Sequence, residues 1–198
     1  MTYCQESGLT PLSRATLVRI LSKCAASVRT SVRGLDYVSA AVAEAFDNLC
    51  DVFETLGDVG EGMGWAKKQE NNLRASKRYL KSDFKVHVSQ SSTVADHCRS
   101  FALSDPKEPS FQATCDHYHS DVCERCVTLA STLNDIEEGL VAESQNMTSN
   151  TKEELVFRVK NAKTAILVWK SHLLRSVNQD GARVQLLEAI DESSVLIV

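Results

Sequence analysis

The stretch Gly34–Leu56, GLDYVSAAVAEAFDNLCDVFETL, decides the fold class of this chain. Its apolar residues recur at alternating spacings of three and four, which is the period of one face of an α-helix. These seam residues are Leu35, Val38, Val42, Ala45, Leu49, Val52 and Leu56. Phe46 and Phe53 widen the seam, which favours packing inside a helical bundle over an isolated two-stranded coiled coil.

The same period predicts further helices on both sides of this stretch. Upstream, the apolar residues of Leu17–Val28 indicate a first helix, and Gly34 is expected to be the break that turns the two helices into a hairpin. Downstream, helical repeats cover Val122–Leu140 and Leu155–Leu173. The short polar link between these two predicts a long antiparallel helical hairpin.

Several segments interrupt the helical pattern. Four glycines within Gly57–Gly64 predict a flexible joint, and the prolines predict an irregular stretch over Ser104–Thr114. The run Val195–Val198 predicts a short terminal β-strand that opens a following domain. The expected organisation is a helical hairpin over 1–60, a basic helix and linker over 61–92, and a metal-binding segment with the long hairpin over 93–198. The predicted fold class is mainly α.

Composition excludes several classes of protein. With 43% hydrophobic residues, 24% charged residues and a net charge of −4, the chain is not expected to be disordered. Its apolar runs fall far short of the roughly 20 residues of a membrane span, and Met1–Gly8 lacks the features of a signal peptide. We expect an intracellular protein, nuclear or cytoplasmic, without a membrane partner. Its seven cysteines favour metal ligands or buried thiols over disulfides.

Cysteine and histidine concentrate in one segment of the chain. The candidate metal ligands are Cys98, Cys115, His117, His119, Cys123 and Cys126. The last two are spaced as Cys-x2-Cys, a common half-site for zinc. Cys115, His117 and His119 are every second residue along the chain, so an extended backbone would point their side chains to one side. We expect a structural zinc site formed by Cys123 and Cys126 with two of the other four, and which two stays open.

No motif of a known enzyme class accompanies this cluster. The His-Glu-x-x-His of zinc proteases and the His-x-Glu with Pro-Cys-x-x-Cys of nucleobase deaminases are absent. P-loop, dinucleotide and nucleophile-elbow motifs are absent as well. We therefore expect no catalysis and no small-molecule substrate. A zinc-dependent hydrolase is the weaker alternative, and reduced core thiols beside surface histidines are the alternative to a metal.

A basic stripe precedes the cluster. Spacings of seven, four, three and four place its members on one helical face: Lys67, Arg74, Arg78, Lys81 and Lys85. Such a stripe can follow a phosphate backbone, and the interleaved Tyr79 and Phe84 add the possibility of contact with bases. The alternative interpretation is a solvated charged face.

Four stretches together resemble a known group of proteins. They are KRYLKSDFK (77–85), DHCRSFALSD (96–105), the Cys115–Cys126 cluster and WKSHLLRS (169–176). The chain from about Leu35 onward resembles a family of uncharacterised invertebrate proteins similar to mobile-element products. In that family such a segment precedes a domain resembling the ribonuclease-H-like fold of DDE transposases. The resemblance implies that the metal-binding acids of such a domain follow position 198.

The sequence therefore predicts a non-catalytic, zinc-stabilised helical module of a transposase-like protein that binds DNA or mediates assembly. A helical protein-interaction scaffold unrelated to DNA is the alternative. It would form a homo-oligomer through the seams of Leu35–Leu56 or Leu155–Leu173.

Overall fold

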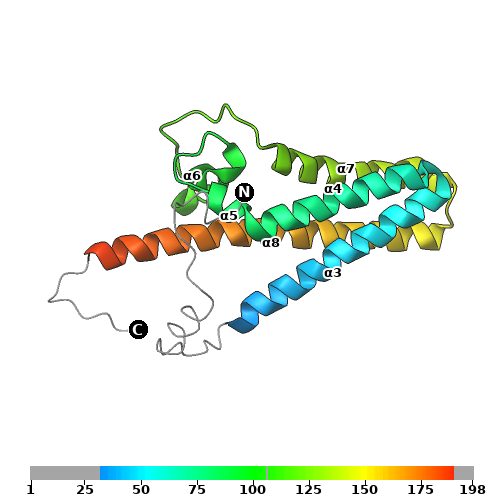
Figure 1. Ribbon diagram of the computed structural model, residues 1–198, viewed down its shortest axis with the longest axis horizontal. Helices are drawn as coiled ribbons and strands as arrows, with labels where there is room; N and C mark the ends of the chain where they lie inside the picture. Colours follow the sequence, from blue (N-terminus) through cyan, green and yellow to red (C-terminus); the bar gives the residue numbers. More distant parts are fainter. Residues whose placement is uncertain (1–31, 106, 190–198) are drawn as a thin grey trace, which may run out of the picture. The chain divides into compact units, whose positions relative to one another are not determined.

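The computed structural model describes residues 32–105 and 107–189, and this part of the chain is mainly helical, as predicted (Figure 1). Its long helices are α3 (Val32–Leu56), α4 (Met63–Ser82), α7 (Glu124–Ala142) and α8 (Ser149–Ala189). The described residues contain no strand. The predicted helix over Leu17–Val28 and the predicted strand over Val195–Val198 lie outside them.

Helix α3 packs antiparallel to both α4 and α8. The ring of Phe53 meets Trp65 of α4 edge to face, with centroids 5.3 Å apart. On its other flank, Phe46 meets Trp169 of α8 in the same manner at 6.4 Å. Such aromatic pairs contribute roughly 0.5–1.5 kcal/mol beyond the burial of their area. The prediction that Phe46 and Phe53 widen the seam for packing in a bundle fits these contacts.

Helix α7 packs antiparallel to both α4 and α8, which completes a four-helix bundle (Figure 1). Gln69 of α4 donates a hydrogen bond from Nε2 to Oδ2 of Asp135 on α7 over 2.8 Å. Lys163 of α8 lies 2.7 Å from the carboxylate of Glu137 on α7. Each long helix is therefore antiparallel to its two neighbours.

The predicted seams form the core of this bundle. Their buried members include Val42, Ala45, Leu49, Val52, Leu56, Leu129, Leu133, Ile136, Leu140, Leu155, Val159, Ala162, Ile166 and Leu173. These side chains pack within a single copy of the chain. None of the described helices combines the length and the apolar character that crossing a membrane requires.

The helix boundaries differ from the prediction in two places. Helix α3 runs through Gly34, so the expected break at this glycine is wrong for the described residues, where α3 already begins at Val32. Helix α7 begins at Glu124, which leaves Val122 73% exposed ahead of the helix. In both cases the seam correctly predicts that a helix is present. It does not give the residue at which the helix begins, because helix ends depend on local capping.

The glycine-rich stretch after α3 is an ordered turn, not the flexible joint that its composition predicts. Residues Gly57–Glu61 form a π-helical turn, and the amide of Gly62 donates to the carbonyl of Gly57 over 3.0 Å. Gly62 has a φ of 87° and a ψ of 144°, a conformation that side chains strongly disfavour. The glycine at this position lets α4 turn back along α3 within a few residues.

Two neighbouring glycines are expected to respond in opposite ways to alanine. Gly62→Ala should lower the free energy of unfolding by about 1–3 kcal/mol, because alanine is strained at this φ. Gly64→Ala, inside α4 with open space around its Cα, should raise it by up to about 1 kcal/mol. Urea denaturation of both variants tests the pair, and equal effects would contradict the assigned backbone conformation.

Candidate metal-binding site

The connection from α4 to α7 is built from short elements at one end of the bundle (Figure 1). These are α5 (Phe84–His87), a 3₁₀ turn (Ala95–His97), α6 (Arg99–Ala102) and a second 3₁₀ turn (Pro109–Phe111). Isolated bridges pair Ser89 with Cys98 and Val94 with Asp121. The predicted irregular stretch over Ser104–Thr114 agrees with the described residues, in which the second 3₁₀ turn is the sole regular element.

This connection has very little apolar core of its own. Among its described residues between Val88 and Val122, the buried ones are Val88, His97 and Cys98. Burial of apolar side chains is the main favourable term in folding, so a segment that buries so few needs another source of stability. Two of the three buried residues are potential metal ligands.

The first group of potential ligands comprises Cys98, Cys115, His117 and His119, whose donor atoms all lie within 4.8 Å of one another. Sγ of Cys98 lies 3.6 Å from Sγ of Cys115 and 3.5 Å from Nε2 of His117. Tetrahedral zinc, with bonds of about 2.3 Å to sulfur and about 2.0–2.1 Å to nitrogen, separates two sulfurs by about 3.8 Å and sulfur from nitrogen by about 3.6 Å. The spacing of these donors therefore suits one tetrahedral ion.

The surroundings of this group resemble those of a metal centre. Nε2 of His119 is buried and has no hydrogen-bond partner among the described residues, a situation that a bound ion would relieve. Nδ1 of His117 lies 3.0 Å from the carboxylate of Asp116, as in carboxylate–histidine–metal arrangements. Nε2 of the same ring is 3.1 Å from the Ser92 carbonyl, a contact that metal binding would replace.

The electrostatics of Cys98 favour its thiolate. Burial opposes ionisation of this thiol, but the neighbouring His119 and the backbone amide of Phe101 outweigh it and lower the pKa of Cys98 to about 7. That amide donates to Sγ over 3.5 Å at the start of α6. Because the thiolate is the form that binds zinc, part of the proton cost of binding is already met at neutral pH.

A second group comprises His97, Cys123 and Cys126, again with all donor atoms within 4.8 Å. Cys123 is the residue before α7 and Cys126 lies in its first turn, which is how the Cys-x2-Cys spacing brings both sulfurs together. Nε2 of His97 lies 3.4 Å from Sγ of Cys126. Burial raises the pKa of Cys126 to about 12 although the ammonium of Lys170 lowers it, so this thiol is protonated at neutral pH unless a metal ion binds it.

The structure thus separates the six predicted ligands into two groups. Cys123 and Cys126 share their group with His97, and the expected combination with two of the other four is not the grouping that the chain adopts. His97 was absent from the predicted ligands, although its position beside Cys98 and near the cluster was a usable signal. Adjacent residues can serve different groups because the 3₁₀ turn ends at His97, and the backbone is extended at Cys98. Both donor sets can hold a metal ion.

The five predicted basic residues are all exposed, and their surface is here called the basic face. Helix α4 carries Lys67, Arg74, Arg78 and Lys81, and α5 carries Lys85. Arg74 pairs with Glu70 at 3.3 Å, whereas the other four form no ion pair with any described residue.

The aromatic residues between these basic residues are not available to nucleotide bases. Tyr79 is 2% exposed and Phe84 is fully buried, and their rings pack edge to face with centroids 6.0 Å apart. The interpretation of these two rings as stacking platforms is therefore wrong. Both belong to the core beneath the basic face.

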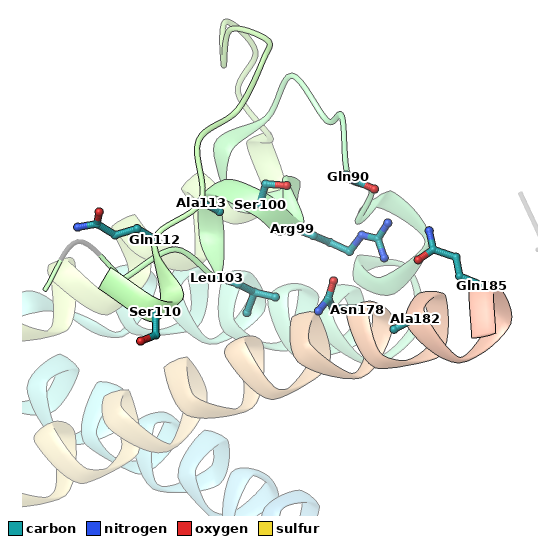
Figure 2. A pocket seen from close by; sticks show the side chains of 10 residues that line it. All are labelled: Gln90, Arg99, Ser100, Leu103, Ser110, Gln112, Ala113, Asn178, Ala182 and Gln185. Atoms are coloured by element: carbon teal, nitrogen blue, oxygen red, sulfur yellow. The ribbon is translucent and has the colours of Figure 1, made fainter. Parts of the chain in front are cut away.

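A polar cleft of about 390 Å³ lies between α8 and the connection from α4 to α7, where α6 supplies part of its wall. Figure 2 shows Arg99 extending from α6 toward Asn178, Ala182 and Gln185 of α8. The guanidinium packs so closely over Gly181 that a Cβ there would lie 2.5 Å from Nη1 of Arg99. Arg99 thus brings α6 into contact with the last helix.

No family model, curated protein or solved structure matches this chain, so the resemblance to transposase-like proteins stays a prediction.

Proposed function

We propose that this chain is a zinc-stabilised helical module that binds nucleic acid through the basic face of α4 and α5. The observation that carries the proposal is a set of exposed cations on α4 and α5 that have no carboxylate partner among the described residues, namely Lys67, Arg78, Lys81 and Lys85. Charges left free of intramolecular pairing are available to phosphates and contribute to binding by releasing counterions. In the transposase-like context that the sequence implies, such a module would hold DNA for a catalytic domain elsewhere.

The zinc in this proposal is structural. Cys98, Cys115, His117 and His119 offer four protein donors, and a closed set of four leaves no coordination position for a reacting water. This favours a stabilising role over the hydrolase alternative. The ion would fix the connection from α4 to α7, whose few buried residues do not otherwise hold it.

Neutralising three members of the basic face tests nucleic-acid binding. We expect the combined variant Arg78→Gln, Lys81→Gln and Lys85→Gln to bind duplex DNA more weakly and with less salt dependence. If each of the three contacts one phosphate, the slope of log affinity against log salt falls in magnitude by about 3. Fluorescence anisotropy with a labelled duplex at several salt concentrations measures both quantities.

A matched variant controls for net charge. The control variant carries Lys152→Gln, Lys160→Gln and Arg175→Gln. It also removes three positive charges, but from exposed positions on α8 that form no ion pair with described residues. It should leave the affinity and the salt slope nearly unchanged. Equal losses of DNA affinity in both variants would show that binding depends only on net charge. If the unmodified chain does not bind DNA, the proposal is wrong and the helical interaction scaffold becomes the leading alternative.

A further inference from the structure

The second ligand group is one donor short of a complete site. His97, Cys123 and Cys126 supply three donors, whereas a structural zinc ion takes four in a tetrahedron. His97 and Cys126 are buried, so an ion held by these three would be poorly placed to recruit a freely exchanging water. The fourth donor has to come from a side chain close by.

His87 is the nearest histidine to this group. It lies at the end of α5, and its ring centroid is 5.8 Å from that of His97. Two imidazoles on one tetrahedral zinc have centroids about 5 Å apart, and the rings of His117 and His119 in the first group are 5.0 Å apart. A shift of the exposed His87 ring by about 1 Å toward His97 would therefore give the two rings the separation that a shared zinc ion requires.

The hydroxyl of Tyr79 lies at the centre of this arrangement. Its oxygen is 3.0 Å from Nε2 of His97, 3.3 Å from Nδ1 of His87 and 3.4 Å from Sγ of Cys123. One buried hydroxyl thus contacts two histidines and one cysteine. The hydroxyl occupies the point on which these three donors converge, so an ion bound by them would displace it from that point.

We propose that His87 completes the second group, so that the chain binds two zinc ions. The first ion is held by Cys98, Cys115, His117 and His119, and the second by His87, His97, Cys123 and Cys126. Each site then has two sulfurs and two nitrogens, a usual donor set for structural zinc. Tyr79 moves to the outer shell, where its hydroxyl donates to the thiolate of Cys123 and orients it.

The second ion acts on the bundle itself. Its ligands come from α5, from the 3₁₀ turn at Ala95–His97 and from the start of α7, so it joins the end of α4 to the beginning of α7. Lys170 of α8 reinforces this point, because its ammonium lies 2.7 Å from the carboxylate of Asp96. The first ion, in contrast, would take all its ligands from within the connection between α4 and α7.

The number of zinc ions on the full chain tests the proposal. Elemental analysis after dialysis should find two per chain, and one in either Cys115→Ser or Cys126→Ser. The inference rests on the zinc-stabilised module proposed above, and these two variants separate the proposals. One ion that only Cys115→Ser removes would overturn the second site alone, whereas no zinc at all would overturn both.

The identity of the fourth ligand is tested by chelator competition with cobalt, whose visible spectrum reports coordination. His87→Ala should lower the affinity of the second site for the ion by more than about 100-fold, which is the upper end for the loss of an outer-shell partner. Tyr79→Phe should lower it by about 10-fold. His172→Ala, on α8 outside both groups, should change neither ion. Unchanged affinity in His87→Ala, or a greater loss in Tyr79→Phe than in His87→Ala, would overturn the assignment.

Discussion

Removal of the proposed zinc by chelation is expected to release residues 88–122 from the bundle while the four long helices stay folded. The released segment buries very few of its described side chains, and two of these, His97 and Cys98, are potential ligands. Structural zinc contributes about 10–16 kcal/mol in small zinc-binding domains at neutral pH, which is far more than this segment gains by apolar burial. The helices are held instead by an apolar core in which Cys126, at the start of α7, is the one buried potential ligand among the described residues.

Hydrogen exchange measured by mass spectrometry checks this result region by region. Peptides from 88–122 should lose protection on chelation, whereas peptides from the centres of α3, α4, α7 and α8 should keep it. Cys50→Ser, which changes a thiol outside both ligand groups, should leave the pattern unaltered. Persistent protection of 88–122 without metal would show that zinc is not what holds the segment.

Replacing Phe53 with alanine is expected to lower the free energy of unfolding by about 3–5 kcal/mol. The side chain is fully buried between α3 and α4, where it meets Trp65 edge to face. Its loss removes apolar burial, leaves a cavity and deletes an aromatic contact at once. For a chain of this size the melting temperature should fall by about 6–20 °C.

Phe157 offers the matching control. It lies on α8 and is 66% exposed, so Phe157→Ala deletes the same atoms at a solvent-exposed position instead of in the core. We expect a change within about 0.5 kcal/mol for this variant. Thermal and urea denaturation of both variants compare the two sites, and similar losses would contradict the packing of α3 against α4.

The helices were predictable from sequence because their seams repeat with the helical period. The seam from Val42 to Leu56 is buried as the spacing indicates, and the hairpin of α7 and α8 follows its short polar link. The glycine-rich turn was not predictable, since the freedom that predicts a flexible joint also permits the sharp turn at Gly62. The same composition supports both outcomes.

The metal ligands were predictable as a set, but their grouping was not. Spacing along an extended backbone suggests which side chains share a side, and it correctly associates Cys115, His117 and His119. It does not give the path of the connection, which brings Cys98 to these three and places His97 beside Cys126. The grouping depends on a fold of about thirty residues with few local rules.

The burial of Tyr79 was predictable from the helical period of α4. Ala66, Gln69, Leu73, Ser76, Tyr79 and Leu80 all lie on the buried side of α4. Tyr79 continues the spacing of three and four that runs from Ala66, so the helical period assigns it to the core. An aromatic residue between basic ones in the sequence can therefore face away from them in space.

The chain between Cys98 and Cys115 contains α6 and the second 3₁₀ turn, and its two ends meet at one group of donors. Its described side chains from Lys107 to Ser110 are exposed. Once such ends are fastened, doubling the length of the intervening chain costs only about 0.6 kcal/mol. An insertion here lengthens the loop without moving its anchors, which makes Lys107–Ser110 the natural place to attach a fluorophore or an affinity tag.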